Sequence, residues 1–463
     1  MKKSIVADLH LHSKYSRAVS KDMILPTMAR MAKIKGIDLL ATGDFTHPLW
    51  FKELESQLKV ASEGIYQVKT GQEAESLARY ILGTEISCIY SQGGKGRRIH
   101  LIVFAPNLET VKKINDKLRQ AGCNLLSDGR PIIGLSAIQL CELLFGIDER
   151  ILVVPAHAWT PWFSLYGSKS GFDSIDECFG AFAQRIWAVE TGLSSDPLMN
   201  WRIGELDSRT IVSFSDAHSP AKLGRELTVL KIKNQKSVPQ RQVTEEATKI
   251  KDTDKNSARF TYQDFMGALK QDGNWEIAAT VEFYPEEGKY HYTGHRNCRV
   301  VQSPQQTKKL GTTCPVCGRP LTIGVMHRVE QLAGREIGEK ELAITTSKEG
   351  VRMLRWQNRP PYMMLVPLQE ILAEVQGMGV ASKGVQSEYE RLITLVGSEL
   401  QVLTKTSLEE LERVSGPRLR EAVAKVRKGD IFIDPGYDGV FGTVKIWGEK
   451  GKQENQPQQE SLF

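Results

Sequence analysis

Histidine and acidic side chains recur at the ends of short apolar stretches in the first 218 residues of this 463-residue chain. His10 and His12 stand two positions apart, and Asp216 and His218 repeat that spacing. Side chains two apart on an extended strand point to the same face, so each pair can ligate a shared metal ion. Two such pairs favour a metal centre over a set of histidines that serve only the core.

Three further residues of ligand type lie between the two pairs. Glu85 ends the stretch YILGTE, where a carboxylate can bridge two cations, and His100 and His157 are placed to hold the second cation. Two cations about 3.5–4 Å apart lower the pKa of a shared water and stabilise the attacking and leaving oxygens of a phosphoester. Histidine-rich ligation favours zinc or manganese over magnesium. The predicted chemistry is metal-assisted hydrolysis, with Asp216, Glu85 and His157 as the catalytic residues.

The elements that must position these residues alternate between short apolar strands and helical stretches as far as about residue 232. A helix is expected at 23–36, and strands are expected at 4–13, 37–45, 97–106, 151–159, 186–192 and 210–219. Such alternation indicates a parallel α/β architecture, a barrel, which carries its chemistry at the carboxyl ends of its strands. The ligand types fall at those ends: His10, His12, Asp44, Glu85, His157, Glu190, Asp216 and His218.

A second group of metal-ligand types lies farther along the chain, where Cys314 and Cys317 stand in a C-P-x-C-G turn. His295 and Cys298, in H-x-x-C, supply the other half of the group. Four such ligands imply a closed, structural zinc site, and clustered cysteines in a cytosolic chain favour metal over disulfides. Two other histidines remain alternatives for the fourth ligand: His291 and, more remote, His327.

Basic residues are concentrated around the cysteine group. Between positions 288 and 360 the sequence has 13 Lys and Arg against 5 Glu, whereas the whole chain has a net charge of +6. A basic middle on a slightly acidic body predicts a face that binds a polyanion, with nucleic-acid phosphates as the target. The candidate DNA-binding residues are Arg296, Arg299, Lys308, Lys309 and Arg319.

The chain shows no signal for export or for membrane insertion. It has no run of about 18 apolar residues, and the two lysines near its start precede no long apolar stretch. We therefore expect a cytoplasmic, nucleoid-associated protein without a membrane partner.

Composition predicts four segments along the chain. They are a barrel at 1–285 with a flexible insertion at 236–258, a zinc-binding module at 286–345, a helical DNA-binding domain at 346–447, and a disordered tail at 448–463. In the helical domain, SLEELERVSGPRLREAVAKV resembles a helix-hairpin-helix, whose glycine turn lets backbone amides meet a phosphate. The alternative is an ordinary helical hairpin.

Aromatic residues crowd the loop that follows His157: Trp159, Trp162, Phe163 and Tyr166. Rings next to a metal centre can stack on an unpaired base drawn out of a duplex, which makes this loop a candidate base pocket. The alternative is a loop that packs its own aromatic side chains.

The barrel region resembles the polymerase-and-histidinol-phosphatase (PHP) superfamily in six successive motifs: ADLHLHSKYS, ATGDF, GTEIS, RRIHLIVF, VVPAHAW and SFSDAHS. The resemblance implies a distorted seven-stranded β/α barrel that holds two or three divalent ions, which are zinc, manganese or magnesium. It assigns His10, His12, Glu85 and Asp216 to the first ion, Glu85, His100 and His157 to the second, and Asp44 and His218 to a third position. Where the family often has further histidines, this chain has Arg17-Ala18 and Phe45, and His47 is either a substitute ligand or a surface residue.

The order of the segments resembles the endonuclease Q family: a PHP barrel, then YHYTGHRNC with CPVCG, then a helical region that ends in PGYDGVFG. This resemblance covers nearly the whole chain apart from the insertion and the tail. It implies a metal-dependent DNA-repair endonuclease that flips the lesion and nicks double-stranded DNA 5′ to uracil, hypoxanthine, xanthine or an abasic site. Two rival functions are a small-molecule PHP phosphatase, which needs neither the zinc module nor the basic surplus, and a non-catalytic DNA-binding adaptor, which does not need the ligand set.

The last five residues resemble the peptide by which bacterial DNA enzymes dock on the sliding clamp, Q-x-[S/D]-L-F. The matching positions are Gln459, Ser461, Leu462 and Phe463. An amide can form hydrogen bonds at the rim of a pocket while the two apolar side chains fill it, and a polar lead-in of about 15 residues gives reach. The sliding clamp is therefore an expected partner.

Overall fold

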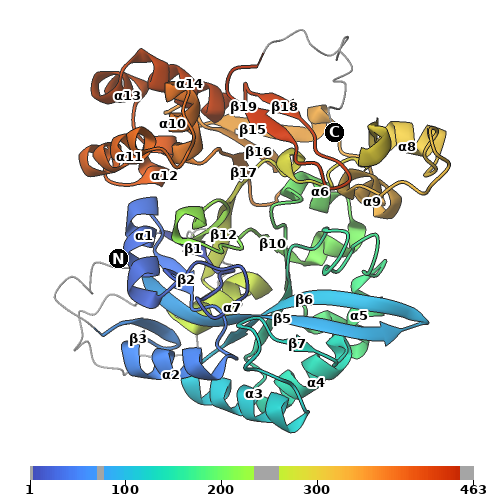
Figure 1. Cartoon of the computed structure of the whole chain (residues 1–463). Helices are drawn as coiled ribbons and strands as arrows, with labels where there is room; N and C mark the ends of the chain where they lie inside the picture. Colours follow the sequence, from blue (N-terminus) through green and yellow to red (C-terminus); the bar gives the residue numbers. More distant parts are fainter. Residues whose placement is uncertain (1–3, 70–77, 234–259, 449–463) are drawn as a thin grey trace, which may run out of the picture. The chain divides into compact units, whose positions relative to one another are not determined.

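The computed structural model describes residues 4–69, 78–233 and 260–448 (Figure 1). The predicted insertion at 236–258 lies outside the described residues, and so does the predicted tail after Gly448, including the clamp-type peptide. No helix in the described ranges is long and apolar enough to cross a membrane.

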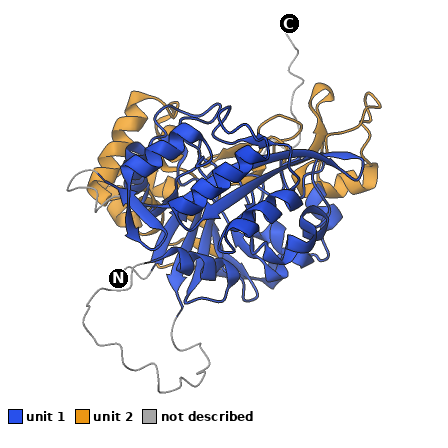
Figure 2. Ribbon diagram, turned by 90° about the horizontal axis from the view of Figure 1, so that it is seen from below, with its two compact units in different colours: residues 1–283, 328–344, 354–363 blue, residues 284–327, 345–353, 364–463 orange. Residues whose placement is uncertain are grey.

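The chain forms two compact units that exchange segments along the sequence (Figure 2). Unit 1 comprises residues 1–283, 328–344 and 354–363, and unit 2 comprises residues 284–327, 345–353 and 364–463. The segments that return to unit 1 are tied to it by ion pairs, since Arg335 and Arg359 both contact Asp207. Unit 1 therefore extends beyond the predicted barrel boundary at residue 285.

Thirteen strands of the described residues join in one mixed sheet. They are β1 (Ser4–Asp8), β2 (Leu39–Ala41), β3 (Leu58–Ser62), β4 (Ile65–Val68), β5 (Arg79–Gln92), β6 (Lys95–Ala105), β7 (Ile132–Ile133), β8 (Leu152–Pro155), β11 (Leu227–Ile232), β12 (Trp275–Glu282), β15 (Leu342–Thr346), β16 (Arg352–Trp356) and β17 (Tyr362–Met364). The short strands β9 (Ala188–Glu190) and β10 (Thr210–Val212) pair in parallel as a separate sheet.

The strand–helix alternation predicted a parallel sheet, but the strand pairing is mixed. Strands β1, β2 and β5 are parallel, with Ala7 opposite Leu39 and Leu40 opposite Tyr80, whereas β11 is antiparallel to β1. Strands β5 and β6 form one long antiparallel hairpin. Gly93 and Gly94 at its tip both have positive φ, which glycine adopts readily and a tight hairpin turn requires.

Unit 1 also contains helices. They are α1 (Leu25–Lys35), α2 (Pro48–Gln57), α3 (Leu108–Gln120), α4 (Ala137–Ile147), α5 (Ile175–Phe179), α6 (Pro197–Trp201) and α7 (Tyr262–Lys270), and α9 (Val325–Leu332) begins in unit 2. Helix α1 ends as predicted at Gly36, whose φ of 87° lets its N–H reach the carbonyls of Ala32 and Lys33.

The core draws apolar side chains from strands that are far apart in the sequence, among them Ala7, Ile81, Val154, Ala188 and Val212. These residues come from β1, β5, β8, β9 and β10, so the strands enclose a common interior, as in a distorted β/α barrel. The predicted fold class is confirmed.

Unit 2 contains small sheets and a helical region. Its elements are β13 (Thr293–His295), β14 (Val300–Gln302), α8 (Pro304–Leu310), α10 (Leu368–Gln376), α11 (Lys383–Val396), α12 (Glu399–Thr404), α13 (Leu408–Ser415), α14 (Pro417–Lys428), β18 (Phe432–Asp434) and β19 (Thr443–Lys445). Helices α13 and α14 form the predicted hairpin around Gly416, whose φ is 85°. The helical region begins at Leu368 rather than at 346, because the apolar residues between these positions pair as strands β16 and β17.

A buried arginine organises the helical region. Arg427 is 1% exposed, and its guanidinium donates hydrogen bonds to four backbone carbonyls, those of Leu403, Val402, Thr406 and Glu349. Two of these carbonyls end α12, so the guanidinium caps the helix where its dipole is negative.

Candidate metal centre

His10 and His12 follow directly after β1 and are both buried. The Nδ1 of His10 lies 3.0 Å from each carboxylate oxygen of Glu190, so this nitrogen donates, and in the neutral ring that a metal binds Nε2 carries the free electron pair. That Nε2 is buried, has no hydrogen-bond partner among the described residues, and lies 3.6 Å from Glu85 and 3.6 Å from Asp216. An orphaned imidazole nitrogen that faces two carboxylates is suited to a metal ion.

Asp44 contacts the Nδ1 side of His12, whereas the other carboxylates of the centre contact its Nε2 side. Its Oδ1 is 3.1 Å from His12 Nδ1, and its Oδ2 accepts hydrogen bonds from Ser13 N, Ser13 Oγ and Ser16 Oγ at 2.6–2.8 Å. Asp44 belongs to none of the ligand groups found among the described residues. Its position favours orientation of His12, whose Nε2 then lies 3.1 Å from Asp216 and 3.4 Å from Glu85.

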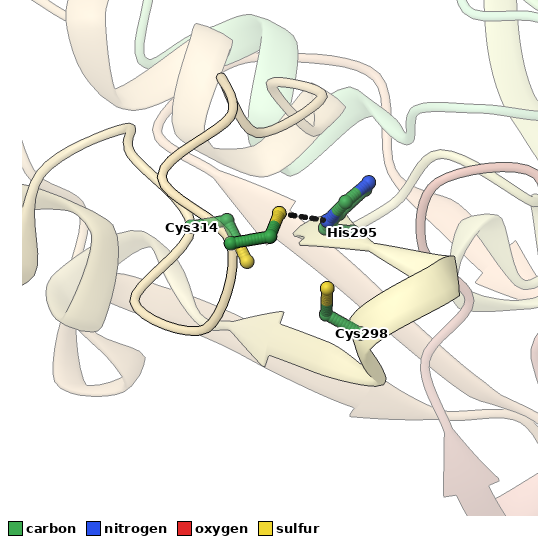
Figure 3. A group of neighbouring side chains, drawn as sticks. His295, Cys298 and Cys314 are labelled. Atoms are coloured by element: carbon green, nitrogen blue, oxygen red, sulfur yellow. Dashed lines mark hydrogen bonds between the residues drawn. The ribbon is translucent and has the colours of Figure 1, made fainter.

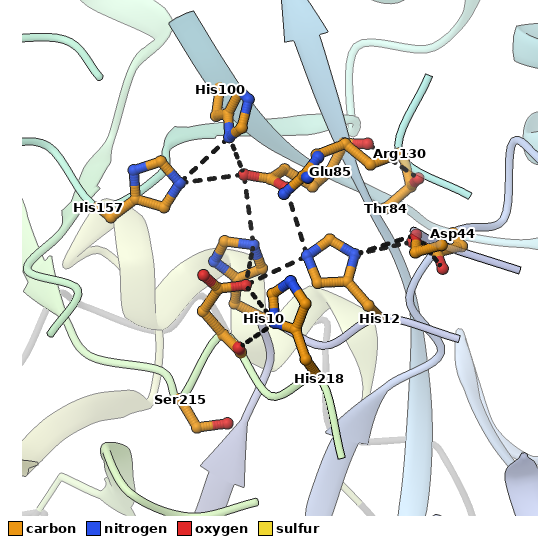
Figure 4. A network of polar contacts seen from close by, with 12 residues as sticks. His10, His12, Asp44, Thr84, Glu85, His100, Arg130, His157, Ser215 and His218 are labelled. Atoms are coloured by element: carbon orange, nitrogen blue, oxygen red, sulfur yellow. Dashed lines mark hydrogen bonds and ion pairs between the residues drawn. The ribbon is translucent and has the colours of Figure 1, made fainter. Parts of the chain in front are cut away.

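Glu85 is the shared carboxylate of the centre (Figure 4). Its Oε1 lies 2.7 Å from His100 Nδ1 and 3.1 Å from His157 Nε2, and its Oε2 lies 3.0 Å from Nη1 of Arg130. The β5–β6 hairpin places Ser87 opposite His100, so Glu85 and His100 are diagonal neighbours on one face.

His157 follows β8 with a φ of 30°, and a Cβ on Gly192 would lie 2.4 Å from the Cβ of His157. Asp216 also has a positive φ, 48°, and its carbonyl accepts a hydrogen bond from His218 Nδ1 at 2.8 Å. The side chains of Asp216 and His218 remain 27% and 35% exposed. These two residues therefore lie on the solvent-accessible side of the centre.

The centre comprises three overlapping ligand groups, in each of which one ligand atom per residue lies within 4.8 Å of the others. The groups are His10 with His12 and Glu85, His12 with Asp216 and His218, and Glu85 with His100 and His157. Glu85 and His12 each belong to two groups, so adjacent ions would share ligands. The residues fit divalent metals.

The electrostatics of the centre favour cations. Burial alone would lower the pKa of His10, but the carboxylates of Glu190, Asp216 and Glu85 outweigh burial and hold this pKa well above 6.5. Burial is likewise outweighed at His12, whose pKa is raised mainly by Asp44. Around His10 and His12 the site therefore has a negative potential that divalent ions would neutralise in place of protons. Burial instead lowers the pKa of His100 to about 4, so this ring stays neutral and can act as a ligand at neutral pH.

The cysteine group forms in unit 2 from three local segments (Figure 3). His295 ends β13, Cys298 ends a 3-10 helix (Arg296–Cys298), and Cys314 and Cys317 stand in a turn closed by Gly318 N–H on the Cys314 carbonyl at 2.9 Å. Their ligand atoms lie within 4.8 Å of one another. The structure thus brings His295, and neither alternative histidine, His291 or His327, into the group.

The surroundings of Cys314 lower the pKa of its thiol and favour the thiolate form. Burial raises its pKa, but hydrogen bonds from the backbone N–H of Cys317, from His295 and from the backbone N–H of Val316 bring the pKa down to about 6. A thiolate is the form that zinc binds, and Cys314 supplies one at neutral pH. Burial and the neighbouring thiols raise the pKa of Cys298 to about 11, so a metal ion would displace the proton of this second thiol. The four ligand types and their closeness fit a structural zinc ion.

The aromatic loop splits into two buried and two partly exposed rings. Trp159 and Tyr166 are 0% exposed, with the Trp159 Nε1 on Asn200 at 2.8 Å and the Tyr166 hydroxyl on Glu205 at 2.8 Å. Their faces are therefore packed inside unit 1 and not presented to a base. Trp162 and Phe163 are partly exposed, and the Phe163 ring lies 4.8 Å from the ring of His100.

The predicted DNA-binding residues are all exposed: Arg296, Arg299, Lys308, Lys309 and Arg319. His47 points away from the ligand groups, because its Nε2 contacts the carbonyl of Leu126 at 3.3 Å and its ring stacks on Tyr15. Sequence reasoning missed Arg130, which lies against Glu85, and the role of Glu190 behind His10. Glu190 was placed at a strand end among the ligand types, but its contact with His10 Nδ1 depends on tertiary packing, and Arg130 has no spacing signal at all.

Two solved structures share the fold of the whole chain. The novel lesion-specific endonuclease PfuEndoQ from Pyrococcus furiosus is 30% identical with a TM-score of 0.76, over 96% of this chain and 95% of that one. An Endonuclease Q in complex with a 27-mer duplex substrate with an abasic lesion at the active site is 31% identical with a TM-score of 0.76, over 97% of this chain and 99% of that one.

Two sequence comparisons add to these. A family model described as the MJ0043 C-terminal domain matches residues 367–430, which include α10 to α14. The uncharacterized protein MJ0043 of Methanocaldococcus jannaschii is 31% identical over 296 residues, which are 64% of this chain and 32% of that protein. The match thus spans about a third of the length of that curated relative.

Proposed function

Because the chain belongs to the endonuclease Q family, we propose that it is a metal-dependent DNA-repair endonuclease that nicks duplex DNA beside damaged nucleotides. The observation that carries the proposal is the match over 97% of the chain to an Endonuclease Q that holds an abasic lesion at its active site. Abasic sites are thus the first proposed substrate. We extend the proposal to uracil, hypoxanthine and xanthine, with the cut on the 5′ side of the lesion.

When bound, the ions would supply a water of lowered pKa and positive charge next to the phosphate oxygens. The residues behind the ligands keep their metal-binding atoms in place. Glu190 holds His10 by Nδ1 and Asp44 holds His12 by Nδ1, so the Nε2 atoms of both rings would be available to bind the ions. An ion-binding site held rigidly in this way needs little reorganisation during the reaction.

Glu85, His100 and His157 would hold the inner ion, because all three are largely buried. Asp216 and His218 are the more exposed ligands, so the scissile phosphate would approach from their side. A base turned out of the duplex would meet Trp162 and Phe163, the partly exposed rings of the aromatic loop.

Unit 2 would bind the DNA backbone. The exposed basic residues next to the zinc group are suited to phosphates, and the α13–α14 hairpin offers backbone N–H groups at the start of α14.

We further propose that the last five residues dock on the sliding clamp. The amino-acid sequence of these five residues is the support for this proposal.

The decisive experiment compares labelled duplexes with and without one abasic site, deoxyuridine or deoxyinosine, in the presence of manganese or magnesium. We expect a single nick 5′ to the lesion and none in undamaged DNA. Asp216→Ala should abolish the nick while lesion binding remains, because Asp216 is a partly exposed ligand. Nicking retained by Asp216→Ala would remove this residue from the ligand set.

Two other results would replace the proposal. Tight binding without cleavage under any metal would identify a DNA-binding adaptor, and turnover of small phosphomonoesters alone would identify a phosphatase.

The test of clamp docking is a deletion. Deletion of residues 459–463 should abolish capture by the sliding clamp without altering nicking of short free duplexes. Capture that survives the deletion would refute clamp docking through this peptide.

A further inference from the structure

Arg130 lies at the metal centre but belongs to none of the ligand groups found among the described residues. Its Nη1 donates a hydrogen bond to Glu85 Oε2 at 3.0 Å, and its other guanidinium nitrogens make no hydrogen bond within the described chain. The Arg130 side chain is 25% exposed, whereas Glu85 is fully buried. Figure 4 shows the guanidinium beside Glu85. One side of the planar Arg130 guanidinium is therefore held by Glu85, and another side remains accessible.

The loop that carries Arg130 is built against the metal centre. The Gly129 N–H donates to the Tyr15 carbonyl at 3.0 Å, and a Cβ on Gly129 would lie 2.3 Å from Asp44 Oδ2. Asp128 Oδ1 accepts hydrogen bonds from the backbone N–H groups of Arg17 and Arg130, both at 3.2 Å. Only glycine fits at position 129, and the contacts fix the backbone on both sides of it. The place of Arg130 is thus determined by the segment that also carries His12.

The charge of Arg130 needs an explanation beyond Glu85. Once divalent ions are bound, a guanidinium beside them is repelled by their charge, and Glu85 already has those ions as partners. An anion that contacts both the ions and the guanidinium removes this repulsion. Asp216 and His218, the exposed ligands, both lie within the electrostatic reach of Arg130. The guanidinium is partly exposed, as these two ligands are, so a phosphate that reaches them from solvent can also reach its unpaired nitrogens.

We propose that Arg130 is a catalytic residue that binds a non-bridging oxygen of the scissile phosphate and stabilises the negative charge that develops there during cleavage. A guanidinium presents parallel N–H donors that match phosphate oxygens, which an ammonium does not. The inference rests on the proposed function, because it assumes a phosphodiester at this centre. The alternative role is structural, in which Arg130 only holds Glu85 in place for the ions.

The test compares Arg130→Ala and Arg130→Lys with Arg150→Ala, an arginine of unit 1 that is 45% exposed and pairs with Asp148. Metal content, melting temperature, affinity for lesion DNA and the single-turnover nicking rate are measured for each. We expect both Arg130 variants to keep their metal and fold and to nick about 100-fold or more slowly, in the range of a lost transition-state donor. Arg150→Ala should nick at the wild-type rate.

Chemical rescue separates the two roles. Added guanidinium at millimolar concentration should restore part of the rate of Arg130→Ala, while urea should not, and neither should restore Asp216→Ala. Loss of metal together with activity in the Arg130 variants, without rescue, would show that Arg130 only supports Glu85 and would overturn the proposal. So would Arg130→Lys at the wild-type rate.

A second substrate distinguishes a failure of the proposed DNA-repair function from a failure of the proposed role of Arg130. If the wild-type protein does not nick lesion DNA, the same variants are compared on bis(p-nitrophenyl) phosphate, a small phosphodiester. A slow, guanidinium-rescued Arg130→Ala would then keep the role of Arg130 while the DNA substrate is abandoned. A wild-type protein inactive on both substrates would overturn both proposals.

Discussion

Glu282, the last residue of β12, carries the most direct test of the electrostatics of unit 1. It is fully buried and accepts hydrogen bonds from Ser213 Oγ and from Thr191 Oγ1. Burial raises its pKa from the ordinary 4.5 to about 8. Glu226 is also fully buried, and burial, together with the nearby Glu282, raises its pKa well above 4.5. The two carboxyls therefore favour the protonated form in the folded protein.

The sign of the effect follows from proton linkage. Between pH 4.5 and 8 the unfolded chain has lost the Glu282 proton and the folded chain retains it. Folding stability therefore falls as pH rises, by about 1.4 kcal/mol for each pH unit. Across pH 5 to 8 the loss is about 4 kcal/mol. Glu282→Gln removes the ionisation and nearly keeps the shape, so the variant should not share this loss.

The assay is thermal unfolding of wild type and Glu282→Gln at pH 5, 6, 7 and 8. A constant offset from altered hydrogen bonds is expected at every pH, but the difference in Tm should move in favour of Gln by several degrees between pH 5 and 8, at about 2 °C per kcal/mol. The control is Glu276→Gln on the same strand, a carboxylate that is 39% exposed. A Tm difference that stays constant with pH would refute the buried, protonated Glu282.

Three further predictions concern the metal sites and unit 2. Glu190→Gln should weaken metal binding about 10- to 100-fold, because the carboxylate that orients His10 and strengthens it as a ligand is lost; a calorimetric metal titration within twofold of wild type would contradict this. Cys314→Ser should remove one equivalent of zinc and lower the unfolding midpoint of unit 2, and unchanged zinc content would refute the structural zinc site. Arg427→Met should cost about 4 kcal/mol in chemical denaturation, because buried carbonyls lose their donors at about 1–3 kcal/mol each; Arg413→Met, which alters a 76% exposed side chain, is the control, and an equal effect of both variants would exclude this role of Arg427.

The ligand residues were readable from the sequence where local geometry alone decides their placement. His10 and His12 share a face because they are two apart on extended backbone, and Cys314 and Cys317 meet because a tight turn lies between them. The end of α1 at Gly36 was readable for the same reason, since only glycine adopts that backbone conformation cheaply. In each case the signal and the structure lie within a few residues of each other.

Placement that depends on tertiary packing was not readable. Asp44 has the right type for a ligand, but the hydroxyls of Ser13 and Ser16 occupy its second oxygen and leave it to orient His12. Trp159 and Tyr166 looked available for stacking, yet Asn200 and Glu205 satisfy their polar atoms inside the core. Nothing in the sequence marks these partners, because they lie between 28 and 41 positions away.

The strand errors have a different cause. The Gly-Gly pair at 93–94 is a hairpin signal that the reading of strand–helix alternation did not use, and it marks the turn of the antiparallel β5–β6 pair. Residues 352–364 become strands because β12 offers a partner edge, which is a property of the sheet and not of their own sequence.

Because the chain leaves unit 1 at residue 283 and returns to it at 328–344 and 354–363, unit 1 cannot complete its fold until these later segments have been synthesised. Unit 1 obtains its last strand, β17, only when residue 363 has been made, about 80 residues after the first 283 are complete. At about 5–20 residues per second, the ribosome needs several seconds to supply it. During that interval the edge of β12 has no partner, and the nascent barrel must wait with this edge open. Truncation at residue 283 would make that transient state permanent, so the catalytic half cannot be isolated by a single cut.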